Sequence, residues 1–222
     1  QALATAIAAQ VGTGNIAGAA TALAIGGPGA IFWMWIAAFL GMATIYAEAI
    51  MAQKYKTVGA DGQVTGGPVY YIRAAFKGTF GKVLAGIFAI LITLALGFMG
   101  NAVQSNSIAA SFHTAFGIPQ WIMGLVVAVI AIFVFMGGMK RIAKVTETIV
   151  PFMAALYIIG SLIVIIYNYK NIPYAFASIF IGAFSPSSVV GGAAGATVKL
   201  ALTKGVARGL FSNEAGMGST PH

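Results

Sequence analysis

Charged residues are scarce in this chain of 222 residues, and cysteine is missing altogether. Only 7% of the residues are charged and 59% are hydrophobic, whereas about a quarter of the residues of an average soluble domain are charged. A water-soluble fold could not bury that much apolar surface, so an ordinary soluble domain is excluded. The lack of cysteine excludes a disulfide framework and a thiolate metal site.

Runs of alternating apolar and polar residues are also missing, which excludes a transmembrane barrel, whose strands alternate over about ten residues. Instead, several uninterrupted apolar runs reach the roughly 20 residues that a helix needs to cross the hydrocarbon core of a bilayer. In lipid, every backbone N–H and C=O must be paired internally, and helices achieve this. The sequence therefore predicts an all-α, polytopic transmembrane helix bundle.

The 12 basic residues outnumber the 4 acidic residues and give a formal net charge of +8. They are scattered between the apolar runs rather than massed on one face or interleaved with aromatic residues, so they do not indicate a nucleic-acid partner. Most of them lie in two segments, at residues 53–82 and 138–146. By the positive-inside rule both segments face the cytoplasm, and we predict that the first helix starts on the cytoplasmic side of the cell membrane.

The apolar runs predict an interrupted first helix and four further spans, at residues 2–25, 30–52, 83–112, 121–139 and 146–167. A shorter apolar piece at residues 172–184 is expected to be re-entrant or interfacial, and a last helix is expected at about residues 189–210. The chain has no basic, cleavable leader and stops just after a glycine-rich stretch. We therefore expect its natural ends to lie elsewhere.

Residues 12–18, Gly-Thr-Gly-Asn-Ile-Ala-Gly, interrupt the first helix. They match a dinucleotide-binding loop weakly, because a β-strand should precede such a loop and a carboxylate should follow about 20 residues later. Gly14 and Gly18 also form a GxxxG pattern, which is typical of close helix packing in lipid. The alternative is a discontinuous transmembrane helix, whose free N–H groups attract a carboxylate and whose free carbonyls attract a cation.

Residues 212–218 form a second glycine-rich break, which contains Glu214. An ionisable group at such a place marks a transport pathway or a conformational lock, unless it is a loop carboxylate paired with Arg208. Glu48 lies near the cytoplasmic end of the second span. There it could extend to the membrane surface, pair with Lys54 or have a functional role.

Gln104 and Asn101 lie three residues apart and share a face of the third predicted span. Such amides either line a polar interior or hydrogen-bond a neighbouring helix, and the pattern does not separate these alternatives. The three tryptophans lie near the outer ends of spans and indicate an aromatic belt. No H-E-x-x-H, P-loop or G-x-S-x-G motif occurs in the sequence, so an enzyme is not expected.

Four motifs together resemble those of the alanine or glycine:cation symporter family, also called the sodium:alanine symporters. They are residues 12–18, 26–35, 66–72 and 208–216, and they spread over nearly the whole chain. The resemblance implies the leucine-transporter-like fold, in which two inverted five-helix repeats each begin with a broken helix. Residues 1–168 would be the first repeat, and residues 169–222 a connector and the start of the second, within one transporter domain that is incomplete at both ends.

The resemblance also implies a sodium-coupled symporter that carries a small neutral amino acid, alanine or glycine, into the cell by alternating access. Sodium would be the coupling ion, and no other cofactor is expected. Substrate contacts are expected from Thr13, Gly14, Asn15, Gln104, Ser212, Asn213 and Gly216, and sodium ligands from Ala8, Gln10, Val11 and Asn15. The alternative function is a passive channel, which would place polar residues along a continuous path.

Overall fold

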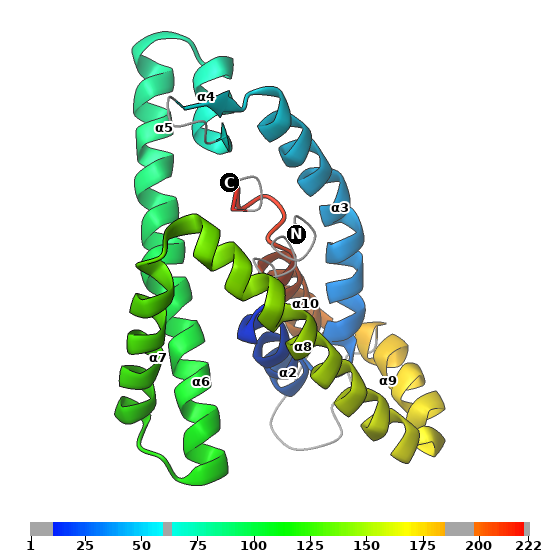
Figure 1. Ribbon diagram of the computed structural model, residues 1–222. Helices are drawn as coiled ribbons and strands as arrows, with labels where there is room; N and C mark the ends of the chain where they lie inside the picture. Colours follow the sequence, from blue (N-terminus) through cyan, green and yellow to red (C-terminus); the bar gives the residue numbers. More distant parts are fainter. Residues whose placement is uncertain (1–10, 60–63, 185–197, 220–222) are drawn as a thin grey trace.

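The computed structural model describes residues 11–59, 64–184 and 198–219, and most of these residues are helical (Figure 1). The helices are α2 (Thr13–Gly26), α3 (Gly29–Lys54), α4 (Pro68–Ala75), α5 (Gly78–Ile92), the π-helix η1 (Thr93–Gly100), α6 (Asn101–Phe116), α7 (Gln120–Phe135), α8 (Gly138–Tyr167), the 3₁₀-helix η2 (Tyr169–Asn171), α9 (Ile172–Phe184) and α10 (Val198–Asn213). Two short strands, β1 (Thr57–Val58) and β2 (Val64–Thr65), pair antiparallel. The predicted helical class is confirmed.

Three described helical segments are long and apolar enough to cross a membrane: residues 29–54, 78–116 and 141–167. The second of them joins α5, η1 and α6 into one continuous helix. Helix α3, this long helix and α7 run in alternating directions (Figure 1). The β1–β2 hairpin and α4 lie at the upper end of the view, and the connection between α6 and α7 lies at the lower end. The hairpin and α4 belong to the basic segment 53–82, whereas the connection between α6 and α7 has no lysine or arginine.

Helix α10 packs against α3 through small residues. A Cβ atom added at Gly209 would lie 2.9 Å from the Cβ of Ala37, and one at Gly205 would overlap the carbonyl oxygen of Ala30. Ala30, Ala37 and Ala201 are buried in the same interface. Close backbone approach of this kind is how helices gain van der Waals contact in lipid, where burial of apolar surface gives no advantage. The interface places the end of α10 beside α3.

Helix α9 packs against the beginning of α3, where the backbones of Gly29 and Gly182 are in direct contact. The indole N–H of Trp33 donates to the carbonyl oxygen of Ala183 at 3.3 Å, and the Trp33 ring meets Phe184 edge to face at 5.9 Å. Trp33 therefore serves helix packing, a role that the predicted aromatic belt did not include.

Several predicted boundaries differ from the structure. The long helix extends beyond the predicted residues 83–112 at both ends, and the span predicted at residues 121–139 is the shorter helix α7, which ends at Phe135. Residues 138–146 were expected to be a loop but form the first turns of α8, because Gly138, with φ 67°, reverses the chain directly after α7. The guanidinium of Arg141 then stacks on the ring of Phe133, 3.9 Å from its centroid, across that turn. Helix α10 continues to Asn213, three residues beyond the predicted end, and stops where Glu214 takes a left-handed conformation with φ 55°.

Candidate functional site

Gly12 caps helix α2, so residues 13–18 of the first predicted break are helical, and residues 1–10 before it lie outside the described residues. Gly12 is extended, with φ −133°, and its N–H donates to the side-chain oxygen of Asn15 at 3.2 Å. The N–H of Asn15 in turn donates to the carbonyl oxygen of Gly12 at 3.1 Å. This reciprocal cap fixes the start of the helix. The first N–H groups of a helix have no acceptor one turn back within the helix.

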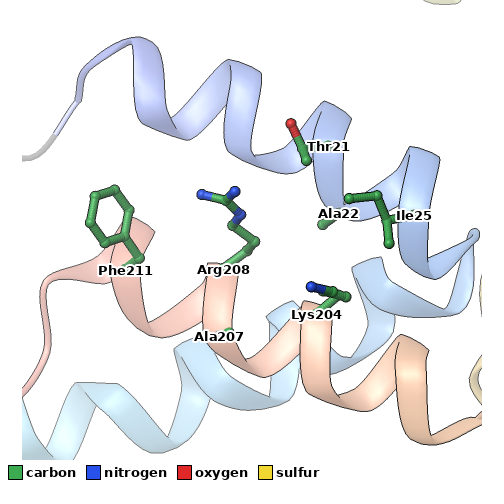
Figure 2. Close-up of a pocket in the computed structure, with 7 residues that line it drawn as sticks. All are labelled: Thr21, Ala22, Ile25, Lys204, Ala207, Arg208 and Phe211. Carbon is green, nitrogen blue, oxygen red and sulfur yellow. The ribbon is translucent and has the colours of Figure 1, made fainter. Parts of the chain in front are cut away.

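The second break follows α10 and consists of tight left-handed turns. Glu214, Gly216 and Gly218 have φ values of 55°, 83° and 71°. The carboxylate of Glu214 accepts a hydrogen bond from the hydroxyl of Ser219 at 2.6 Å, which closes the turn on itself. The expected pairing of Glu214 with Arg208 is therefore wrong. Figure 2 shows that Arg208 points from α10 toward α2 instead.

The two breaks meet in space. The side-chain amide of Asn15 donates to the carbonyl oxygen of Ser212 at 3.4 Å, although the two residues are 197 positions apart in the sequence. A pocket of about 560 Å³ opens beside this contact, and both breaks line it, through Val11 and Asn15 and through Ser212, Asn213 and Ala215. Its other wall belongs to α3 and consists of Trp35, Ala38, Phe39, Gly41, Met42 and Ile45. The size falls within the roughly 300–1,000 Å³ typical of small-ligand sites.

Asn213 brings an unused hydrogen-bond donor to this pocket. Its Nδ2 atom is buried and has no hydrogen-bond partner among the described residues. The same atom lies 4.0 Å from the position that a Cβ of Gly41 would occupy, so it faces α3 across the pocket. Buried polar atoms without a partner are rare in folded proteins, and one at a pocket wall is suited to a ligand oxygen.

Gln104 borders the first break from the side of α6. A Cβ atom at Gly12 would lie 2.5 Å from Nε2 of Gln104, so the side-chain amide rests on the bare backbone of Gly12. Asn101 behaves differently, because its amide donates at 2.9 Å to the carbonyl oxygen of Gly97 in its own helix. This amide group therefore does not make the expected hydrogen bond to a neighbouring helix, and whether Asn101 lines a polar interior stays a prediction. Its bond lies at the end of η1.

Gly14 and Gly18 do not form the close helix contact that their GxxxG spacing suggested. A Cβ at Gly14 would meet only the ring edge of Phe211, at 3.4 Å, and one at Gly18 would meet Cδ of Arg208, at 3.7 Å. Both distances are ordinary contacts with the ends of side chains. These side chains border a second pocket, of about 270 Å³ between α2 and α10, into which Lys204 and Arg208 point (Figure 2).

The remaining predicted residues are distributed as follows. Ala8 and Gln10 lie outside the described residues, and Thr13 opens α2 with a side chain outside the described part. Gly14 and Gly216 are described but do not line the large pocket. No sequence signal singles out the wall from α3, because its residues are those of any lipid-facing helix. Among the described residues, no group of three or more histidine, cysteine or carboxylate side chains could hold a metal ion.

Comparison with known proteins identifies the family. The model of the sodium:alanine symporter family matches residues 1–222. The chain is 48% identical over 222 residues to the sodium/alanine symporter AgcS of Methanococcus maripaludis, covering 100% of this chain and 48% of the relative. It is also 48% identical to the putative sodium/proton-dependent alanine carrier protein YrbD of Bacillus subtilis, covering 100% of this chain and 44% of that protein.

A further relative is the probable sodium/glutamine symporter GlnT of Bacillus subtilis, which is 46% identical over 222 residues, covering 100% of this chain and 45% of the relative. The chain therefore spans about half the length of the curated relatives that it matches. The resemblance carried by the four sequence motifs is confirmed, and the chain belongs to the sodium:alanine symporter family.

Proposed function

We propose that this chain is part of a secondary active transporter that carries a small neutral amino acid into the cell together with sodium. The observation that supports this proposal most directly is the meeting of the two breaks at Asn15 and Ser212. Backbone groups that are released inside a transmembrane protein are tolerated only where they line an enclosed, polar site. Two such breaks at one pocket favour a binding site over a helix packing defect.

The proposed site has two poles. The N–H groups that open α2, at Thr13 and Gly14, would receive the carboxylate of the amino acid, because the N-terminus of a helix carries a partial positive charge. The carbonyls that end the preceding segment, at Ala8, Gln10 and Val11, would receive sodium together with Asn15. The donor of Asn213 and the amide of Gln104 would complete the contacts to the substrate.

We propose the leucine-transporter-like arrangement for the complete protein, with residues 1–168 as the first repeat and residues 169–222 as the connector and the start of the second. The contact of α2 with α10 supports this proposal, because each of these helices borders one of the two breaks. Alternating access would then move one repeat against the other around a fixed site.

Alanine or glycine is the substrate that we propose. The bulky apolar side chains of Trp35, Phe39 and Met42 line the large pocket and leave polar contacts to the breaks alone. Such a wall suits a ligand with a charged backbone and a small apolar side chain. Two of the relatives above are named for alanine and one for glutamine. Competition by unlabelled glutamine against labelled alanine therefore tests whether the substrate is glutamine instead.

The test is counterflow of labelled alanine in liposomes that contain the full-length protein, with and without sodium. Saturable, sodium-dependent exchange that unlabelled glycine competes for supports the proposal. Flux that neither saturates nor requires sodium would establish the passive channel instead. Asn15→Ala is expected to reduce exchange, whereas Asn168→Ala is the matched control, because the Asn168 amide donates only to Val164 in its own helix, at 2.9 Å.

We also propose that the chain is a protein of the cell membrane with both basic segments in the cytoplasm. Single cysteines at Lys56 and Lys144 should then react with an impermeant thiol reagent only after the membrane is opened. A cysteine at Ile118, between α6 and α7, should react in intact cells. The reverse labelling pattern would invert the topology.

A further inference from the structure

Among the described residues, Glu48 is the only charged side chain that is buried, with 7% of its surface exposed. It lies six residues before Lys54, the last residue of α3, and therefore about 9 Å inside the helix end. Two of the alternatives expected for it are wrong. It does not extend to the membrane surface. Lys54 does not pair with it but lies over the ring of Tyr55, 5.6 Å from the centroid.

The carboxylate of Glu48 instead contacts the second break. It accepts hydrogen bonds from the backbone N–H groups of Gly216 and Gly218. Both glycines have positive φ values, 83° and 71°, and this backbone conformation allows alternate N–H groups to point at one acceptor. The segment held in this way follows directly after Asn213 and Ala215, which line the large pocket.

One oxygen of the carboxylate is not satisfied. Oε2 of Glu48 is buried and has no hydrogen-bond partner among the described residues. A charged buried carboxylate is costly unless hydrogen bonds, a counter-charge or a metal ion compensate both of its oxygens, and an oxygen without such a partner is a place for a proton. Hard cations require several oxygen ligands, whereas the neighbours of Glu48 in the second break are N–H donors, and the described residues hold no group of carboxylates or histidines. A proton is the ligand that this arrangement fits.

In the part of the chain that the structure describes, the titratable groups around Glu48 do not supply a counter-charge. Tyr71 of α4 faces it, and burial, followed by the negative charge of Glu48, raises the pKa of the Tyr71 hydroxyl. Glu214 of the second break is engaged by Ser219. On α10, Lys204 and Arg208 point toward α2 (Figure 2). Helix α2 has no titratable side chain, and Tyr174 of α9 is 78% exposed.

We propose that Glu48 is a proton-binding site that links α3 to the segment after α10. The deprotonated carboxylate holds the Gly216 and Gly218 N–H groups strongly and keeps this segment against α3. When Oε2 takes a proton from the aqueous phase, the charge of Glu48 is lost and its hydrogen bonds to both glycines weaken. The wall that Asn213 and Ala215 contribute to the pocket is then released. This inference rests on the proposed function in one respect, because it takes the large pocket to be the substrate site.

The first test measures the KM for sodium-dependent uptake of labelled alanine between pH 5 and pH 8 in liposomes with the full-length protein. Sodium is held constant and the pH is equal on both sides. For the wild type, we expect KM to rise about tenfold from high to low pH, since charge-assisted hydrogen bonds are about twice as strong as neutral ones. Glu48→Gln should be independent of pH and resemble the wild type at low pH.

Two variants control this experiment. Glu147→Gln in α8 removes a carboxylate from another helix and should keep the wild-type pH dependence. Glu48→Asp keeps a titratable group and should shift the midpoint. The proposal is overturned if Glu48→Gln keeps the pH dependence of the wild type, or if the wild type has none.

An infrared measurement tests the site without transport. The C=O stretch of a protonated buried carboxyl should titrate in the purified wild type, change frequency in Glu48→Asp and be missing in Glu48→Gln. If Glu48→Gln does not fold, the wild type and Glu48→Asp decide the question. Lack of alanine exchange in the wild type refutes the proposed function, whereas lack of a titrating carboxyl band refutes the proton site.

Discussion

Gly12→Ala is expected to impair transport without unfolding the protein. Gly12 has an extended backbone, with φ −133°, which alanine adopts without strain. The new Cβ atom, however, would lie 2.5 Å from Nε2 of Gln104. To restore an ordinary contact of 3.4 Å, the Gln104 amide must move by about 0.9 Å. It can do so cheaply, because the atom is the end of a flexible side chain, but it then leaves its place at the first break.

The magnitude follows from the hydrogen bond that is lost. A neutral hydrogen bond contributes about 0.5–1.5 kcal/mol, which corresponds to a rise of about two- to tenfold in the KM for alanine. The thermal midpoint of Gly12→Ala should fall less than that of a variant whose new side chain clashes with backbone atoms. The displaced group is the mobile end of the Gln104 side chain, and α6 keeps its other contacts. Uptake of labelled alanine in liposomes gives KM, and fluorescence-monitored unfolding gives the midpoint.

A double-mutant cycle tests this mechanism. Gln104→Ala alone should raise KM by a similar factor, and Gly12→Ala added to Gln104→Ala should have little further effect, because no amide remains to be displaced. Effects that add in full would mean that Gly12→Ala acts on something other than Gln104. An unchanged KM in a well-folded Gln104→Ala protein would refute the role of Gln104 in the substrate site.

Three further predictions concern the pocket and its frame. Gly14→Val should abolish alanine binding in isothermal titration while the protein elutes as a single species, because its Cβ meets only the Phe211 ring edge at 3.4 Å but covers the N–H groups that open α2; aggregation would indicate a packing role instead. Gly209→Val should lower stability by about 1–3 kcal/mol through overpacking against Ala37 and Met34, measured as a fall in thermal midpoint, and an unchanged midpoint would contradict the α3–α10 interface. Asn213→Leu should raise the thermal midpoint and weaken alanine binding, because it removes a buried donor without a partner, and a fall in stability would show that the donor has a structural partner.

The three long apolar segments were predictable because length and apolar content are local properties of the sequence. The short apolar piece at residues 172–184 has the predicted limits, and the long helix ends at Phe116, close to the predicted residue 112. The boundary at residues 138–146 was not predictable in the same way. Basic residues indicate the side of the membrane, but they do not show whether the backbone is helical. The stacking of Arg141 on Phe133, which supports the helical start, is a tertiary contact.

The candidate site was predictable in part. Glycine and asparagine indicated where α2 begins and where α10 ends, since these residues weaken a helix and release backbone groups. The hydrogen bond between Asn15 and Ser212 joins segments 197 residues apart, and only the family resemblance placed them together. Glu48 shows the limit of such an analysis. Its position near the end of an apolar helix is compatible with a surface contact, and its actual partners, Gly216 and Gly218, depend on turns in a distant segment.

Two GxxxG patterns of the chain, one in α2 and one in α10, show why spacing alone does not assign a role to glycine. Gly14 and Gly18 have the pattern in α2, and Gly205 and Gly209 have it in α10. At Gly209, an added Cβ would meet the Cβ of Ala37 at 2.9 Å, whereas at Gly14 the nearest atom is the end of a side chain at 3.4 Å. The pair in α10 brings the neighbouring helix α3 close, whereas the pair in α2 leaves its own backbone accessible. A glycine that no neighbouring backbone needs, at the opening of a helix in a transmembrane protein, can serve a ligand, and this supports the proposal that Gly14 contributes to the substrate site rather than to the packing of the bundle.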